Sequence, residues 1–95
     1  MAKGYRIVRG DVRDPETYGR YVQANAEPFA RYGARFLARG GRTEAVEGTA
    51  RARNVIIEFD SYEQARSYYY SPEYQAAVRH RSPAAEADIV LVEGA

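Results

Sequence analysis

The chain contains no cysteine, and this absence excludes several kinds of chemistry at once. Disulfide bonds, thiol nucleophiles and thiolate-bound metals all require cysteine. Histidine is scarce as well, since His80 is the only one. A structural zinc ion needs several ligands, mostly of these two residue types, so we expect no metal site. A haem bound through His80 has no further support in the sequence, and we expect no cofactor.

An excess of one charge is also missing. The 95 residues carry 14 basic and 13 acidic side chains, for a net charge of +1. Domains that bind nucleic acids usually show a clear basic excess, so we expect no nucleic-acid partner. Lys3 is the only lysine, and the resulting arginine bias has two explanations. One is a GC-rich genome, and the other is recognition of anions by forked guanidinium groups.

Long apolar segments do not occur. No apolar run approaches the roughly 20 residues that a membrane-spanning helix needs, and the first residues lack the apolar centre of a signal peptide. We therefore expect a cytoplasmic protein with no membrane partner. The length predicts one domain over residues 1–95, and the 45% hydrophobic and 28% charged residues are ordinary globular values.

Four segments are predicted to form β-strands, because they are rich in β-branched and apolar residues. They cover residues 5–9, 35–39, 54–59 and 87–93. Residues 43–47 also look extended, beyond the Gly40-Gly41 pair. Paired glycines in a strand indicate a bulge or a sharp bend. Residues 35–47 are therefore expected to form either one long bent strand or two short ones.

The first helix is expected to begin at Asp14-Pro15, which combines an N-cap with a proline at the first helical position. Aromatic and apolar residues then recur at helical spacing up to about Tyr32. Pro28 lies inside this segment and predicts a kink or a break, because proline cannot donate a backbone hydrogen bond. Gly33 suits the C-terminal cap.

Two short helices are predicted between the third and fourth strands. Ser61 starts the first with capping-box spacing, and Ser71-Pro72 starts the second. Tyr69 belongs to the predicted buried stripe of the first of them. With the two counted as one, the element order is βαββαβ. This order is typical of a ferredoxin-like α+β fold, in which the sheet is antiparallel and the helices cover one face.

The opposite face of that sheet is expected to pair with a second copy of the chain. Ile56, Val90 and Val92 alternate with the residues that should face the helices, so both faces carry apolar side chains. A large exposed apolar patch marks an interface. We therefore expect a homodimer through the sheet face; the alternative is a monomer with a mildly apolar exposed face.

Several short stretches occur in an order that is specific in combination. They are FLARGG (36–41), VEG (46–48), VIIEF (55–59), SPEYQ (71–75) and VEG (92–94). In these stretches, over almost its whole length, the chain resembles the DUF1330 family of bacterial domains. That family is similar to the dimeric α/β-barrel superfamily, in which two ferredoxin-like subunits meet sheet to sheet. The resemblance implies this fold and this assembly. It implies chemistry only by analogy with the cofactor-free monooxygenases, isomerases and haem-degrading enzymes of the superfamily.

Glu58 and His80 are the candidate catalytic residues. Glu58 lies within an apolar strand, where a carboxylate must be paired, hydrogen-bonded or raised in pKa. A raised pKa would suit a general acid or base; the alternatives are a structural ion pair with Arg39 or Arg6, or outward exposure. His80 can move a proton near neutral pH, or it is a solvated or capping residue at the end of a charged helix.

Arg39, Arg81, Tyr69 and Tyr5 are the candidate ligand-binding residues. The two arginines can bind a carboxylate or a phosphate by forked hydrogen bonds, although both also fit structural roles at the ends of their elements. Tyr69 could lie against a ligand and Tyr5 could reach a pocket mouth, while burial in the core is the alternative for an aromatic side chain.

These residues favour a small organic molecule bound in an apolar pocket between sheet and helices. If the protein is an enzyme, which the sequence leaves open, the expected reactions are cofactor-free oxygenation and proton-transfer isomerisation. The main alternative is a non-catalytic dimeric module with a structural or stress-related role. RNA-recognition domains share the βαββαβ order, but residues 54–59 lack their aromatic stacking platform.

Overall fold

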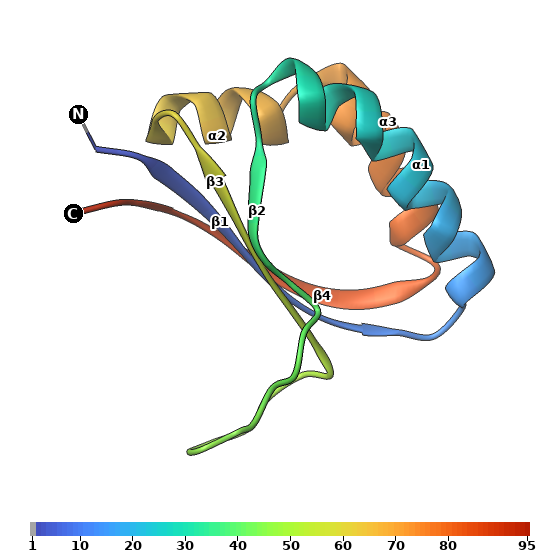
Figure 1. Cartoon of the computed structure of the whole chain (residues 1–95). Coiled ribbons are helices and arrows are strands. Elements are labelled where there is room, and N and C mark those ends of the chain that lie inside the picture. Colours follow the sequence, from blue (N-terminus) through green and yellow to red (C-terminus); the bar gives the residue numbers. More distant parts are fainter. Residues whose placement is uncertain (1) are drawn as a thin grey trace.

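The computed structural model describes residues 2–95 and contains four strands and three helices (Figure 1). The strands are β1 (Gly4–Val12), β2 (Arg35–Arg39), β3 (Arg53–Phe59) and β4 (Ala85–Glu93). The helices are α1 (Pro15–Arg31), α2 (Tyr62–Tyr69) and α3 (Pro72–Arg81). The predicted α+β order is confirmed, and the second helical segment is divided in two as expected.

The strands form one antiparallel sheet in the order β2-β3-β1-β4. All three helices lie on one face of this sheet (Figure 1). Helix α2 packs directly on the strands, whereas α1 packs chiefly against α3. Because α1 is held by another helix, its inner side chains and those of the sheet can enclose a space between them.

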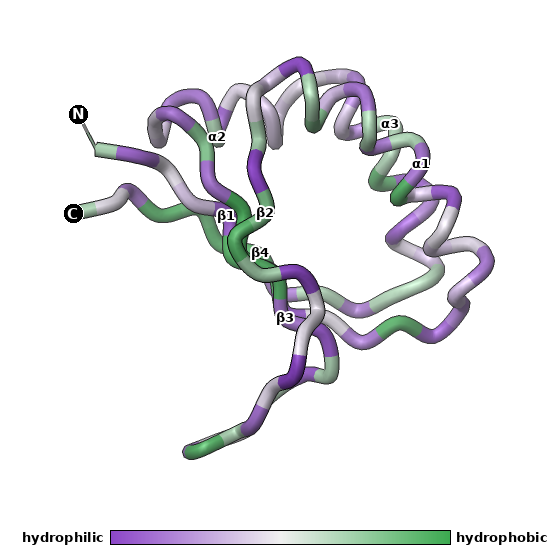
Figure 2. Tube along the Cα trace, in the orientation of Figure 1, coloured by the Kyte–Doolittle hydropathy of each residue, from purple (hydrophilic) through white to green (hydrophobic). Residues whose placement is uncertain are grey.

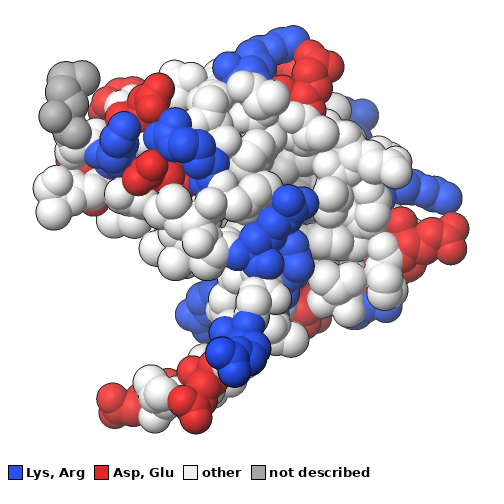
Figure 3. Space-filling model, in the orientation of Figure 1, with Lys and Arg blue, Asp and Glu red and all other residues white. Residues whose placement is uncertain are grey.

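Strand β2 is shorter than the extended segment that the sequence predicts. It ends at Arg39, and Gly40 turns the chain with a φ of +64°, a conformation that favours glycine. Residues 40–52 then extend away from the body, with charged atoms of both signs along them (Figures 1 and 3). The expected strand at 43–47 is therefore wrong, because this segment meets no neighbouring strand; Val46 is 80% exposed.

Helix α1 begins at its predicted cap and continues through Pro28. The Asp14 carboxylate accepts hydrogen bonds from the backbone N–H and the hydroxyl of Thr17, at 3.2 and 2.7 Å. The expected break at Pro28 does not occur. Pro28 removes one backbone hydrogen bond, the one to the Ala24 carbonyl, but only three residues of the helix follow it. Gly33 ends the helix with a φ of +68°, as predicted. Every helix within residues 2–95 is too short or too polar to span a membrane.

Ser71 joins α2 to α3 and fixes where α3 begins. Its buried Oγ donates to the carbonyl of Tyr68 at 2.8 Å and accepts from the backbone N–H of Tyr74 at 3.1 Å. One hydroxyl therefore completes the end of one helix and the start of the next.

The variant Ser71→Ala is expected to lower the free energy of unfolding by about 1 kcal/mol, the usual cost of losing an N-cap. Chemical denaturation followed by circular dichroism measures this change. Ser67→Ala is the matched control, because Ser67 is exposed inside α2 and caps nothing. Equal stability of the two variants would show that the Ser71 hydroxyl does not cap α3.

The core is built largely from aromatic rings. Val55, Ile57 and Phe59 point from β3 toward the helices, where they meet the fully buried rings of Tyr68 and Tyr74. The ring of Tyr68 lies 5.2 Å from that of Phe59 and 4.8 Å from that of Tyr74. The buried residues of α2 are Ala65 and Tyr68, which are three residues apart and lie on the same side of the helix. Tyr68 therefore occupies the fully buried position that was predicted for Tyr69.

The face of the sheet away from the helices, called the open face below, is apolar at its centre. Cross-strand pairing places four of its residues in one row across all four strands, namely Ala38, Ile56, Ile7 and Val90. Ile56 and Val90 are both exposed, and Val90 is 56% accessible. Figure 2 shows apolar positions gathered along the middle of the strands. The predicted alternation of residues 54–59 and 89–92 between the two faces is confirmed.

Candidate functional site

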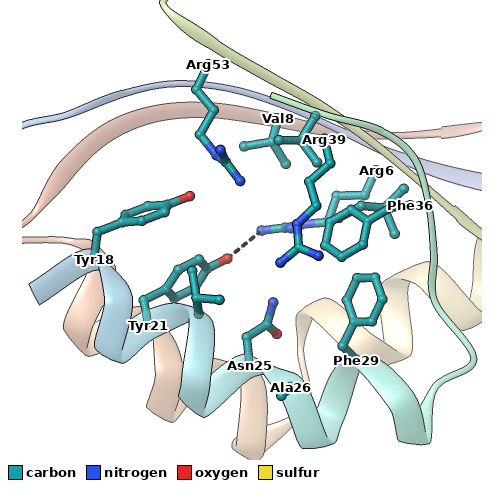
Figure 4. A pocket seen from close by; sticks show the side chains of 13 residues that line it. Arg6, Val8, Tyr18, Tyr21, Asn25, Ala26, Phe29, Phe36, Arg39 and Arg53 are labelled. Carbon is teal, nitrogen blue, oxygen red and sulfur yellow. Dashed lines mark hydrogen bonds between the residues drawn. The ribbon is translucent and has the colours of Figure 1, made fainter. Parts of the chain in front are cut away.

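A cavity of about 270 Å³ lies between α1 and the helix-facing side of the sheet (Figure 4). It is lined by Arg6, Val8, Tyr18, Tyr21, Val22, Asn25, Ala26, Phe29, Phe36, Arg39, Arg53, Val55 and Ile57. Val22 and Ala26 of α1 and Phe36 and Arg39 of β2 are exposed, so the cavity opens to solvent between these two elements.

Among residues 2–95, three guanidinium groups line this cavity, and no carboxylate does. Arg6, Arg39 and Arg53 come from β1, β2 and β3, and the alternation of the strands brings all three to the helix-facing side. None of the ion pairs found within residues 2–95 includes any of them. The cavity is therefore a site of concentrated positive charge in apolar surroundings.

Arg6 is the most buried of the three, with 2% of its surface exposed. One of its terminal nitrogens, Nη2, donates to the hydroxyl of Tyr21 at 3.3 Å and to the hydroxyl of Tyr74. Its guanidinium carbon lies 5.0 Å from the ring centre of Tyr74 and 5.7 Å from that of Tyr68. Its Nε is buried without a hydrogen-bond partner. Because arginine keeps its charge in proteins, this is a buried cation with no anionic partner among residues 2–95.

Two tyrosine hydroxyls connect Arg6 to a second arginine. The hydroxyls of Tyr21 and Tyr74 lie 3.0 Å apart, and Arg81 Nη1 donates to Tyr74 at 3.4 Å. The guanidinium of Arg81 also lies 5.7 Å from the ring centre of Tyr21. Burial raises the pKa of Tyr74 well above its ordinary value, so this hydroxyl keeps its proton at neutral pH.

Aromatic rings hold the two arginines nearer the mouth. The guanidinium of Arg39 lies 4.1 Å from the ring centre of Phe36, which in turn stacks on Phe29 at 4.5 Å. Arg53 lies 5.9 Å from the ring centre of Tyr18, and its Nε is buried without a partner. Cation–π contacts position a guanidinium but leave its N–H groups free to bind an anion.

Glycine at position 40 leaves space for one of these arginines. A Cβ there would lie 2.6 Å from Nη1 of Arg53. Gly40 thus serves both the turn that ends β2 and the close approach of the Arg53 side chain.

Glu58 and Tyr5 lie on the open face, away from the cavity. Tyr5 Oη donates to Glu58 Oε2 at 3.0 Å, and Arg35 Nε donates to Oε1 at 3.1 Å. These hydrogen bonds, from Tyr5 first and then Arg35, hold the pKa of Glu58 below its ordinary value. The expectation that Glu58 faces a ligand pocket is corrected: strand alternation groups it with Ile56, and its ion-pair partner is Arg35.

The other predicted site residues are not gathered at one place. Arg39 lines the cavity. Arg81 lies beside it and reaches it only through Tyr74 and Tyr21. Tyr69 and His80 lie outside it, Tyr69 over β4 beside Leu91 and His80 near the end of α3. Of the six, Arg39 alone contributes to the cavity wall.

The principal residues of the site, Arg6, Tyr21 and Arg53, were not predicted as site residues. One signal for Arg6 was present in the sequence. Arg6 lies two residues before Val8 in the first strand, so its side chain is on the same face as an apolar residue. Recognising it requires the strand pairing, which shows that this face is the one under the helices.

The described part of the chain, residues 2–95, contains no group of three or more His, Asp or Glu side chains that could hold a metal ion. The polar groups at the cavity are guanidinium, phenol and amide. A guanidinium group can only donate hydrogen bonds, and it binds anions rather than cations.

Solved structures with the same fold include proteins of unknown function and a cofactor-independent oxygenase. A protein of unknown function from Rhodopseudomonas palustris, RPA0582, has a TM-score of 0.76 at 19% identity, covering 96% of this chain and 81% of that one. SnoaB, a cofactor-independent oxygenase from Streptomyces nogalater, has a TM-score of 0.67 at 15% identity, covering 97% and 92%. A dimeric ferredoxin-like protein of unknown function from Thermobifida fusca has a TM-score of 0.60 at 17% identity, covering 99% and 91%.

These likenesses establish the ferredoxin-like fold. No curated protein matches the chain. The family model described as "Domain of unknown function (DUF1330)" matches residues 3–95, nearly the full length. The chain therefore belongs to the DUF1330 family.

Proposed function

We propose that this protein binds a small organic acid in the cavity between α1 and the sheet. The observation that carries this proposal is the set of three arginines, Arg6, Arg39 and Arg53, around a space that no carboxylate enters. A protein that only needed a stable core would gain little from burying a guanidinium without a counterion. An anionic ligand supplies that counterion.

The size and walls of the cavity narrow the ligand further. Ligand sites usually measure roughly 300 to 1,000 Å³, and about 270 Å³ lies just below this range. A molecule with a single ring and one acidic group fits such a volume. The rings of Phe29, Phe36 and Tyr18 offer flat apolar contact to it. An open cavity of this kind favours ligand binding over a purely structural module.

Conversion of the ligand is a second candidate function, of cofactor-independent oxygenase or isomerase type. The fold shared with SnoaB favours it. Within the described part of the chain, no carboxylate and no imidazole lines the cavity. A proton would therefore have to pass through a phenol such as Tyr21, or the substrate would have to enter as an anion.

We also propose that two copies pair through their open faces. The apolar row of Ala38, Ile56, Ile7 and Val90 supports this assembly. Proteins with the same fold are described as dimeric, among them the one from Thermobifida fusca.

Replacing the two arginines at the mouth tests the binding proposal. Arg39→Gln and Arg53→Gln are each expected to weaken the binding of benzoate about tenfold, because each removes one charge-assisted contact. Titration calorimetry or protein NMR measures the affinity. Benzamide, which has the same shape without the charge, is expected to bind weakly to every variant.

Arg79→Gln serves as the control, since it removes the same charge from an exposed position on α3 outside the cavity. If all three variants lower the affinity for benzoate equally, the effect comes from net charge and the site proposal fails. It also fails if the wild-type protein binds no aromatic acid at millimolar concentration.

A further inference from the structure

The hydrogen bonds around Tyr74 determine where its proton points. Its oxygen accepts from Arg6 Nη2 and from Arg81 Nη1, and both of these groups can only donate. Among the described residues, the hydroxyl of Tyr21, at 3.0 Å, is the one acceptor that the Tyr74 proton meets. Tyr74 therefore donates to Tyr21.

The opposite direction is disfavoured. If Tyr21 donated to Tyr74, the Tyr74 oxygen would face three donors and its own proton would have no acceptor. The Tyr74 side chain is fully buried, so water could not satisfy that proton. A buried donor without an acceptor is costly.

The proton of Tyr21 is left free by this arrangement. The Tyr21 oxygen accepts from Tyr74 and from Arg6, which occupies both of its lone pairs. No acceptor for the Tyr21 proton is found within residues 2–95, and Tyr21 lines the cavity beside Arg6 (Figure 4). Its O–H is therefore available to a ligand in the cavity.

Arg6 lies on the same wall, with its guanidinium beside the Tyr21 hydroxyl at 3.3 Å. Its Nε is buried and finds no partner within residues 2–95, so the hydrogen-bonding capacity of this cation is not filled by the protein. The Tyr21 hydroxyl and the Arg6 guanidinium are thus two preorganised donors in a largely apolar space, and one of them is charged. Such a pair is suited to binding an oxyanion.

We propose that Arg6 and Tyr21 form an oxyanion subsite that binds the acidic oxygen of an aromatic carboxylic acid. The Tyr21 hydroxyl and the Arg6 guanidinium both donate to that oxygen, while the ring lies against the apolar walls. Tyr74 is a positioning residue, because it fixes the direction of the Tyr21 proton. This inference rests on the proposed function and names the group that the cavity recognises.

The variant Tyr21→Phe tests the subsite with benzoate as the probe. It removes one O–H and retains the ring, so we expect benzoate to bind about tenfold more weakly, with benzamide bound weakly by both proteins. In the wild-type protein, the ¹⁵N–¹H NMR signal of the Arg6 Nε group is expected to shift as benzoate is added. Tyr70→Phe is the control, because Tyr70 is exposed at the end of α2.

A double-mutant cycle separates positioning by Tyr74 from a general structural effect. Tyr74→Phe is expected to weaken benzoate binding several-fold when Tyr21 is present, and by less when position 21 is already phenylalanine, because only the bond from Arg6 to Tyr74 is then lost. A merely structural role would weaken binding equally in both backgrounds.

The outcomes distinguish this inference from the proposed function. If Tyr21→Phe binds benzoate as tightly as the wild type while Arg39→Gln weakens it, the subsite is wrong and the acid-binding function stands. An Arg6 Nε signal that does not move as benzoate saturates the protein also overturns the subsite. If the wild-type protein does not bind benzoate, both proposals fall.

Discussion

The variant Arg6→Met is expected to bind benzoate with an affinity about 100-fold lower than the wild type, or lower still. The reason is that the substitution removes a buried, charged donor from an ion pair with the ligand. Arg6 is the deepest of the three cavity arginines, and its guanidinium is screened from water by Tyr21, Tyr68 and Tyr74. An electrostatic contact in such surroundings is stronger than one at the exposed mouth. The loss should therefore exceed that of Arg39→Gln or Arg53→Gln.

The same variant is expected to keep its stability within about 1 kcal/mol of the wild type, or to gain some, because apolar replacement of a buried ion is often neutral or favourable. Arg6 has no carboxylate partner within residues 2–95, and its Nε forms no hydrogen bond. Methionine fills a similar space, and Tyr21 and Tyr74 can still bond to each other. The cation–π contacts that are lost offset part of this gain.

Two measurements on Arg6→Met check this pair of effects: benzoate titration and denaturant unfolding. Arg66→Met, at an exposed position of α2, makes the same chemical change away from the cavity and should retain binding. If Arg6→Met unfolds with a loss of several kcal/mol, Arg6 is a structural residue and not a residue kept for a ligand. If it still binds benzoate with wild-type affinity, the acid binds elsewhere.

The fold was predictable from the sequence because its signals are local. Alternation identifies the strands, and the Asp14-Pro15 and Ser71-Pro72 pairs mark the starts of α1 and α3. The misplaced strand at 43–47 shows the limit of such signals. Whether an extended segment joins a sheet depends on a partner strand, which local sequence does not specify.

The site was less predictable, because it depends on which residues face each other across strands and helices. The alternation of residues 54–59 already grouped Glu58 with Ile56, on the face opposite Phe59. Nothing in the sequence, however, showed which partner would meet Glu58, and Arg35 does so only through the pairing of β2 with β3. Arg6 and Tyr74, 68 residues apart, are joined only by the packing of α3.

The variant Val90→Asp is expected to convert the proposed dimer into a monomer at micromolar concentration. Val90 lies opposite Ile7 in the central row of the open face, which continues to Ile56 and Ala38. In a two-fold dimer each change occurs twice, so two carboxylates would enter a dry interface without partners. Sedimentation velocity measures the result, and Ala76→Glu, on the exposed side of α3, controls for added charge.

The same variant tests whether the cavity is complete within one copy. All of the lining residues come from a single chain and lie on the other side of the sheet from Val90. Monomeric Val90→Asp is therefore expected to bind benzoate with nearly the affinity of the wild type. A monomer that has lost binding would mean that the second copy holds the site together. A wild-type protein that sediments as a monomer would overturn the pairing proposal and leave the acid-binding proposal standing.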